Sequence, residues 1–149
     1  MYKSILLYLI IPAIILFDQA TKKIALSKLK AGKVESCCHN IVKLTLVKNP
    51  GAAFGILKSR QLLLKVITVS IIVVIAYFLI YFTIMEFCIK IALSLVFVLG
   101  GAVGNLIDRF RFSYVVDFFT FKFKGCPVFN IADMFILLGA IIFAINAVI

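Results

Sequence analysis

Long apolar segments alternate with polar and basic connections along the 149-residue chain. The segments 66–85 and 91–107 contain no charged residue, and their lengths suit the roughly 17 to 25 residues that a helix needs to cross a bilayer. The segment 129–149 is equally apolar except for Asp133 and Asn130 near its start and Asn146 near its end. We therefore expect it to cross the bilayer with Asp133 about one helical turn inside.

The first apolar segment, 5–17, is shorter than the others. A cleaved signal peptide is an alternative, but no obvious small-residue cleavage site follows, and three more apolar segments lie downstream. Apolar positions continue amphipathically to Ala20 and Ile24. We therefore interpret it as a membrane helix kinked near Pro12. The sequence predicts an α-helical polytopic membrane protein with four transmembrane helices in a single domain, 1–149.

The connections between these helices differ greatly in length. Only a tight turn around 86–88 separates the second helix from the third, which predicts an antiparallel hairpin. With four spans, the two long connections, about 27–61 and 108–128, must emerge on the same side. Their parts 41–47 and 114–124 are rich in β-branched or alternating residues, which predicts strands at headgroup level.

The composition is that of a protein in lipid. Hydrophobic residues make up 64% of the chain, charged residues make up 15%, and the mean hydropathy is +1.20, whereas soluble domains are about half apolar and a quarter charged. The formal charge of +10 is best explained by basic loops at lipid headgroups, and we expect no nucleic-acid partner. The long connections hold most of the basic residues, so the positive-inside rule taken alone would place them in the cytoplasm.

The cysteines and the histidine do not indicate a metal site or a catalytic triad. The four cysteines show no Cys-x-x-Cys spacing, so we expect no metal and no cofactor. The adjacent Cys37, Cys38 and His39 are poorly spaced for one tetrahedral ion. A disulfide between this loop and Cys126 is possible on an oxidising side but is not required. His39 is the only histidine, which makes a His-based catalytic triad improbable.

The acidic residues carry the chemical interest, because five of the six lie at the predicted side of the long connections: Asp18, Glu35, Asp108, Asp117 and Asp133. Asp117 lies in an apolar, strand-like stretch, where desolvation raises a carboxyl pKa; the alternative is a solvated loop residue. Asp133 has a structural alternative, a capping box in which Asn130 is the N-cap of the last helix. As a pair, one aspartate would stay ionised to activate water. The other, protonated, would polarise a carbonyl and protonate the leaving amine.

Further polar residues lie close to the predicted membrane edge. Asn105 could hydrogen-bond a peptide backbone, while Asp108 and Arg109 could pair with groups across the two long connections or, for Arg109, anchor at headgroups. Asp18 is four residues before Lys22, a spacing typical of a helix-end ion pair. Other motifs suit close backbone approach: the Gly100–Gly104 pair, and the turn at 49–55 that contains Asn49 and Gly51.

In order and spacing, five blocks of this sequence resemble those of bacterial lipoprotein signal peptidase, also called signal peptidase II. The blocks cover nearly the whole chain: DQATK at 18–22, NPGAAFG at 49–55, GAVGNLIDR at 101–109, VVDF at 115–118 and FNIAD at 129–133.

The resemblance implies an aspartic endopeptidase of the bacterial inner membrane with its active site at the extracytoplasmic face. Such enzymes remove the signal peptide of prolipoproteins, cutting just before a cysteine that carries diacylglyceryl, and globomycin inhibits them. The resemblance makes Asp117 and Asp133 the catalytic pair and gives Asn105 and Arg109 contacts to substrate and inhibitor. Supporting positions follow from the same blocks: Asn49, Gly51, Asp18, Asp108 and Asn130.

The family fold implied is four membrane helices with a small extracytoplasmic β-cradle and a short helix from the first long connection. We expect prolipoprotein substrates, contact with membrane lipids and a monomer. The implied orientation is opposite to the one that the charge rule gives, and we follow the family because its motifs are more specific. Members often end in a basic tail, which does not follow Ile149 here.

Two other functions fit the composition. A small four-span transporter would use membrane carboxylates to relay protons or bind cations, but it would need an acid near the middle of a span. A non-catalytic assembly subunit would tolerate the loss of both aspartates.

Overall fold

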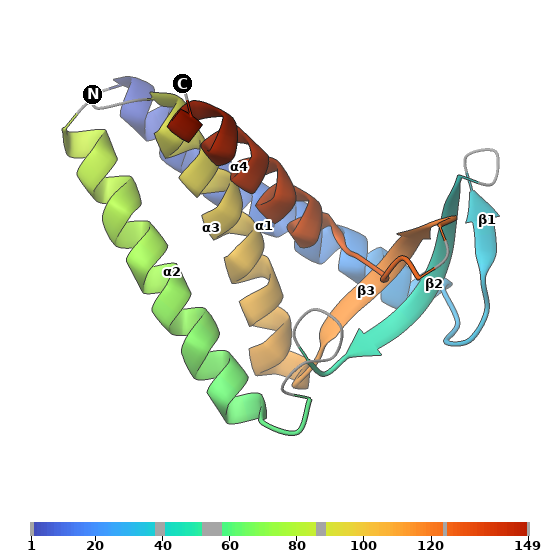
Figure 1. Cartoon of the computed structure of the whole chain (residues 1–149). Coiled ribbons are helices and arrows are strands. Elements are labelled where there is room, and N and C mark those ends of the chain that lie inside the picture. The colour runs from blue at the N-terminus through green and yellow to red at the C-terminus, as the bar shows by residue number, and fades with distance from the viewer. Residues whose placement is uncertain (1, 38–40, 52–57, 86–88, 124, 149) are drawn as a thin grey trace.

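The computed structural model describes residues 2–37, 41–51, 58–85, 89–123 and 125–148. Glu86 and the predicted turn around it, together with Cys38, His39 and Cys88, lie outside these residues. The described residues form four helices and a three-stranded sheet (Figure 1): α1 (Tyr2–Lys28), β1 (Glu35–Cys37), β2 (Val42–Asn49), α2 (Gln61–Ile84), α3 (Ile89–Phe112), β3 (Val115–Phe121) and α4 (Ile131–Val148).

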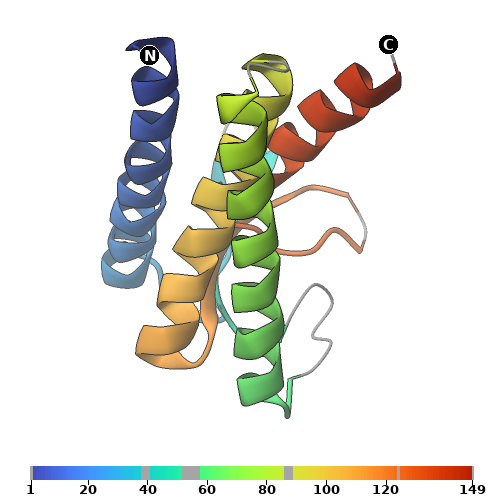
Figure 2. The same cartoon turned by 90° about the vertical axis from the view of Figure 1, so that its left-hand side faces the viewer.

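Helix α3 is the centre of the bundle, because it packs against α1, α2 and α4. Figure 2 shows α1 and α4 on opposite sides of the α2–α3 hairpin, with both chain termini at the same end of the molecule. A buried apolar cluster that includes Leu7, Leu79, Val96 and Leu99 joins α1, α2 and α3. The α3 helix is thus the scaffold on which the other helices are placed.

Small residues on α3 let its neighbours approach closely. A Cβ atom on Gly104 would lie 2.7 Å from the carboxylate of Asp18 on α1, and one on Gly101 would collide with the backbone carbonyl of Ala132 on α4. Gly100 faces Ile14 on α1. The predicted use of the Gly100–Gly104 pair for helix contact is confirmed, and Gly101 serves α4 in the same way.

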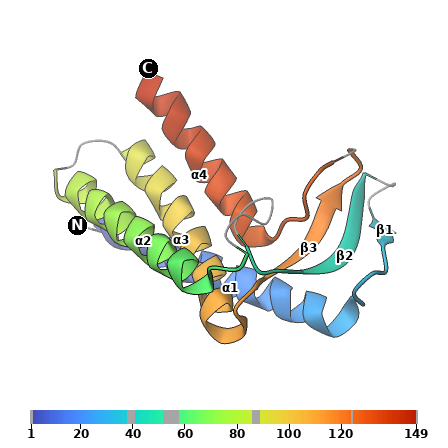
Figure 3. The same ribbon diagram turned by 60° about the horizontal axis from the view of Figure 1, so that its bottom comes forward.

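The sheet lies beyond the helix bundle, next to the C-terminal end of α1 (Figure 3). Its strand order is β1-β2-β3, with both pairs antiparallel. The pairing places Val47 opposite Asp117, and the register shifts between Leu44 and Val47. The strands predicted at 41–47 and 114–124 are confirmed as β2 and β3 with somewhat different ends, whereas β1 was not predicted.

Two helices, α2 and α3, are long and apolar enough to cross a membrane by length and composition, while α4 is apolar but shorter. The four predicted helices are therefore present, and their crossing of a membrane is supported for two of them. Helix α1 is continuous through Pro12. No helix occurs at 29–37, 41–51 or 58–60, and the remaining parts of the first long connection, where the implied loop helix could lie, are outside the described residues.

Candidate active site

Asp133 is held at the first turn of α4 by a reciprocal capping box. The backbone N–H of Asp133 donates to Asn130 Oδ1 over 2.9 Å, and the backbone N–H of Asn130 donates to Asp133 Oδ2 over 3.2 Å. The predicted capping box is therefore confirmed. It places the carboxylate of Asp133 at the positive end of the α4 helix.

Asp117 lies on β3 and is buried, with 3% of its surface exposed. Its oxygens accept hydrogen bonds from Asn130 Nδ2 over 2.7 Å and from Asn49 Nδ2 over 3.0 Å. The interpretation of Asp117 as a solvated loop residue is wrong, because the packing of β2, β3 and the segment before α4 excludes it from solvent.

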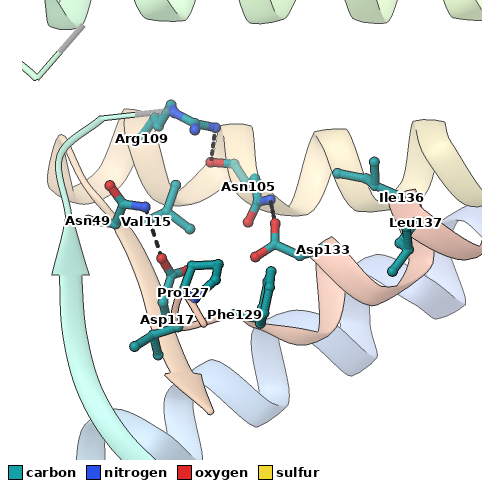
Figure 4. A pocket seen from close by; sticks show the side chains of 11 residues that line it. Asn49, Asn105, Arg109, Val115, Asp117, Pro127, Phe129, Asp133, Ile136 and Leu137 are labelled. Atoms are coloured by element: carbon teal, nitrogen blue, oxygen red, sulfur yellow. Dashed lines mark hydrogen bonds between the residues drawn. The ribbon is translucent and has the colours of Figure 1, made fainter. Parts of the chain in front are cut away.

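Asn105 and Asn130 connect the two carboxylates. Asn105 Nδ2 donates to Asp133 Oδ1 over 2.8 Å (Figure 4), and Asn105 Oδ1 accepts from Asn130 Nδ2 over 3.0 Å. Asn130 itself contacts both Asp117 and Asp133. Asn130 thus contacts both carboxylates, and Asn105 contacts Asn130 and Asp133.

The amide oxygens of all three asparagines are occupied by donors. Asn49 Oδ1 accepts from Gly51 N over 3.0 Å, Asn130 Oδ1 accepts from Asp133 N, and Asn105 Oδ1 accepts from Lys22 Nζ over 2.9 Å. Each amide nitrogen must therefore face a carboxylate, so the hydrogen-bond network itself sets the orientation of the amides.

Behind Asn105 lies a buried cluster of ions. Lys22 Nζ is 2.9 Å from Asp18 Oδ2 and 3.0 Å from Asp108 Oδ2, and all three side chains are at most 2% exposed. Asp18 also accepts from the backbone N–H of Ala132 over 2.9 Å, and Asp108 accepts from that of Val116 over 3.0 Å. The cluster thus joins α1 and α3 to the start of α4 and to β3, next to the two candidate aspartates.

A cavity of about 260 Å³ contains both aspartates. Its wall includes both polar and apolar side chains, and α4 contributes the apolar Ile136 and Leu137; Leu137 is 53% exposed. The lining residues come from five segments of the chain: Asn49, Asn105, Arg109, Val115, Asp117, Pro127, Val128, Phe129, Asp133, Ile136 and Leu137. Figure 4 shows Asn49, Asp117, Asn105 and Asp133 together at this cavity.

Arg109 lies at the edge of this cavity. Its guanidinium makes two long hydrogen bonds of 3.4 Å, to the carbonyl oxygens of Asn105 and Gly51. Its Nε is buried and has no hydrogen-bond partner among the described residues. Arg109 therefore retains donor capacity next to the two aspartates.

Burial and the nearby charge of Asp133 raise the pKa of Asp117 to about 6. Burial is the larger cause, while the hydrogen bonds from Asn49 and Asn130 and the charge of Lys22 oppose it. Asp117 is thus about half protonated near pH 6, within the range where a carboxylic acid can donate a proton.

The structure brings together all nine residues singled out from the sequence. Asn49, Asn105, Arg109, Asp117 and Asp133 line the cavity, and Asn130 and Gly51 hydrogen-bond lining side chains from behind it. Asp18 and Asp108 accept from the backbone N–H groups of Ala132 and Val116, which adjoin lining residues in the sequence. The i,i+4 ion pair of Asp18 and Lys22 is confirmed.

No local pattern places Lys22 against Asn105, so the link of Lys22 to the site was not predicted. Cys126 is a free thiol in the described part of the chain.

Comparison with known proteins shows which family this chain resembles. Residues 10–149 match the family model described as "Signal peptidase (SPase) II". The lipoprotein signal peptidase of Halothermothrix orenii is 42% identical over 91% of this chain and 90% of its own length. That of Streptococcus pneumoniae is 35% identical over 97% and 94%.

A solved structure described as a bacterial membrane enzyme has a TM-score of 0.84 and 30% identity, and the match covers 99% of this chain and 88% of that one. A family model that spans nearly all of the chain, relatives of matching length and a shared fold all lead to the same assignment. The chain belongs to the signal peptidase II family.

Proposed function

We propose that this protein is a membrane-embedded aspartic endopeptidase that removes the signal peptide from prolipoproteins, with Asp117 and Asp133 as its catalytic residues. The family assignment supports the signal peptidase activity. The observation that carries the aspartic mechanism is that two carboxylates from separate elements line one cavity and share the donor Asn130. Two such carboxylates can hold one proton between them.

The environments of the two aspartates differ. Asp133 accepts hydrogen bonds from Asn105 Nδ2 and from the backbone N–H of Asn130, and we assign it the role of the base. Asp117 is more deeply buried, and its raised pKa of about 6 makes it the proton carrier. The pair nevertheless titrates as a coupled unit.

The reaction follows from this arrangement. Asp133 takes a proton from a water molecule as the water oxygen attacks the scissile carbonyl carbon, while Asp117 gives its proton to the carbonyl oxygen. In the second step the carbon–nitrogen bond breaks, Asp133 protonates the leaving nitrogen, and a hydroxyl of the diol intermediate returns a proton to Asp117. The products are a carboxylic acid and an amine, and the dyad regains its starting state.

The shape of the cavity suits a substrate that arrives from lipid. Ile136 and Leu137 form an apolar part of the wall on α4, next to Asp133 (Figure 4). A signal peptide with diacylglyceryl on the cysteine after the scissile bond could approach along this apolar wall. Arg109, with its unused donor, is then placed to bind backbone carbonyls of the peptide.

We further propose that the site faces the extracytoplasmic side of the bacterial inner membrane, with the segments about 27–61 and 108–128 outside the cytoplasm, and that the enzyme acts as a monomer. The sheet and the ends of the helices that carry Asp108 and Asp133 lie at one end of the molecule, and the termini lie at the other (Figure 1). This arrangement supports the proposal that both long connections lie on the same side of the membrane. The transporter alternative is disfavoured, since the described acids of the helices, Asp18, Asp108 and Asp133, lie toward this end.

The test is cleavage of a diacylglyceryl-modified precursor by the purified protein, with and without globomycin, to which the family resemblance predicts sensitivity. Asp117→Asn and Asp133→Asn should each lower the cleavage rate by at least about a thousandfold, because each removes a proton-transfer group. Glu35→Gln, at an exposed acid on β1 outside the cavity, is the matched control. Cleavage by either Asp variant at the wild-type rate would disprove the dyad.

A further inference from the structure

A second cavity, of about 450 Å³, lies between α1 and α3. It shares no lining residue with the candidate active site. Its wall contains both cationic and apolar side chains. The residues that matter here are Leu16, Lys23 and Leu26 of α1, together with Arg111 and Phe112 of α3.

The charge in this cavity is positive. Lys23 and Arg111 are exposed, and neither forms a salt bridge with a described residue. The only acid among the described wall residues, Asp108, is 1% exposed and already accepts from Lys22, Gln19 and the backbone of Val116. The Arg111 guanidinium stacks over Phe112 at 5.1 Å from the ring centroid, which orients it at the cavity. Two cations are thus available to an anion.

The remaining wall is apolar and open to the surroundings. Leu16 is 70% exposed, while Leu26 and Phe112 are each 37% exposed. Leu16 belongs to the apolar part of α1, more than one helical turn before Lys23. From Lys23 back to Leu16 the wall therefore changes from cationic to apolar, as a phospholipid does from its phosphate to its acyl chains, and Leu26 and Phe112 add further apolar wall. A soluble anion such as phosphate would gain nothing from contact with the apolar part of the wall.

We propose that this cavity binds one anionic phospholipid, with its phosphate between Lys23 and Arg111 and an acyl chain along Leu16. Basic pockets between membrane helices are suited to anionic headgroups, and each cation near the surface adds to the attraction. The site is separate from the peptidase chemistry and does not depend on it.

The site also touches the buried ions that support the candidate active site. Lys22 and Asp108 form part of the cavity wall, and Lys22 donates to Asn105 on its other side. A lipid bound here would bridge α1 and α3 at this level. Because it binds the folded protein, it raises the melting temperature with lipid concentration.

The test uses the full-length protein in a neutral detergent, with phosphatidylglycerol or phosphatidylcholine added and the melting temperature followed by circular dichroism. Phosphatidylglycerol should raise the melting temperature of the wild type in a saturable way, and phosphatidylcholine should raise it much less. Lys23→Gln/Arg111→Gln should weaken the apparent affinity about tenfold or more. Lys30→Gln/Lys122→Gln removes the same charge from exposed positions outside the cavity and should respond as the wild type does.

A second variant, Ala20→Phe, fills the cavity at an exposed wall position without changing its charge and should also abolish the response. It keeps the test valid if the double variant does not fold. The proposal is overturned if phosphatidylcholine acts as strongly as phosphatidylglycerol, if both cavity variants respond as the wild type does, or if inorganic phosphate alone reproduces the full effect. Cleavage of precursor is measured separately, so its failure would not bear on this site.

Discussion

Lys22 donates a hydrogen bond to the side-chain oxygen of Asn105 over 2.9 Å, and both residues are buried. The same Asn105 amide presents its nitrogen to Asp133. A cation on α1 therefore determines which way an amide on α3 points, and that amide in turn holds a carboxylate on α4. We infer that Lys22 is a positioning residue for the proposed dyad.

Replacing Lys22 with Met should lower kcat at least about tenfold with little change in KM, because the network orients the dyad and does not contact substrate, and small misplacements are costly. The variant also leaves two buried carboxylates unpaired, so its stability should fall as well. Steady-state kinetics below the melting temperature of the variant separate the two effects. Lys28→Met, at an exposed lysine of α1 outside both cavities, is the control, and a Lys22→Met kcat within twofold of wild type would refute the positioning role.

The cleavage rate should depend on the protonation of Asp117. Because its pKa is about 6 and the proposed mechanism needs the protonated form, kcat/KM should fall as pH rises through about 6. Asn49→Leu removes a hydrogen bond that lowers this pKa, so the fall should move to higher pH. Asn146→Leu, on α4 away from the site, should leave the profile unchanged. An Asn49→Leu profile identical to that of the wild type would contradict the assignment.

Stability should depend on the same group. The pKa of Asp117 is about 6 in the folded protein, against an ordinary value of 3.8 for a solvated aspartate, so the folded state binds the proton more tightly than the unfolded chain does. The contribution of Asp117 to the free energy of unfolding is therefore largest below about pH 4. It falls by roughly 3 kcal/mol as the pH rises through about 6. The difference in unfolding free energy between the wild type and Asp117→Asn, measured from pH 4 to 8, isolates this contribution. A difference that stays constant with pH would contradict the raised pKa.

Gly101→Ala should disturb both stability and catalysis. The added Cβ collides with the backbone carbonyl of Ala132, which directly precedes Asp133, so α4 must shift away from α3. We expect a loss of about 1–3 kcal/mol in unfolding free energy, together with a lower kcat. Ala144→Leu adds bulk to an exposed position of α4 and should be nearly neutral. Wild-type stability in Gly101→Ala would show that this contact is not tight.

The sequence predicted the helices and several of the residues that line the cavity, because their signals are local or one-dimensional. Uncharged segments long enough to cross a bilayer predicted α2 and α3, and the spacing of Asn130 and Asp133 predicted a capping box. Because successive connections between four predicted spans alternate sides of the membrane, the sequence alone also predicted that the two long connections share one side.

What the sequence could not supply depends on contacts between distant segments. The i,i+4 spacing showed Lys22 beside Asp18, but the approach of Asp108 and Asn105 arises from the packing of α1 on α3. The strand β1 has only three residues, Glu-Ser-Cys, whose pattern does not indicate a strand, and it forms because β2 offers a free edge. Burial of Asp117 likewise depends on Asn49 and Asn130 arriving from other elements.

Asp117 is on β3, whereas Asp133 and its cap are on α4, the last helix that the structure describes. During synthesis, a nascent chain that has emerged only as far as β3 carries one carboxylate and lacks the asparagine that joins the two. Under the proposed mechanism, hydrolytic capacity therefore arises only once α4 has been made and has docked against Gly101 and Gly104.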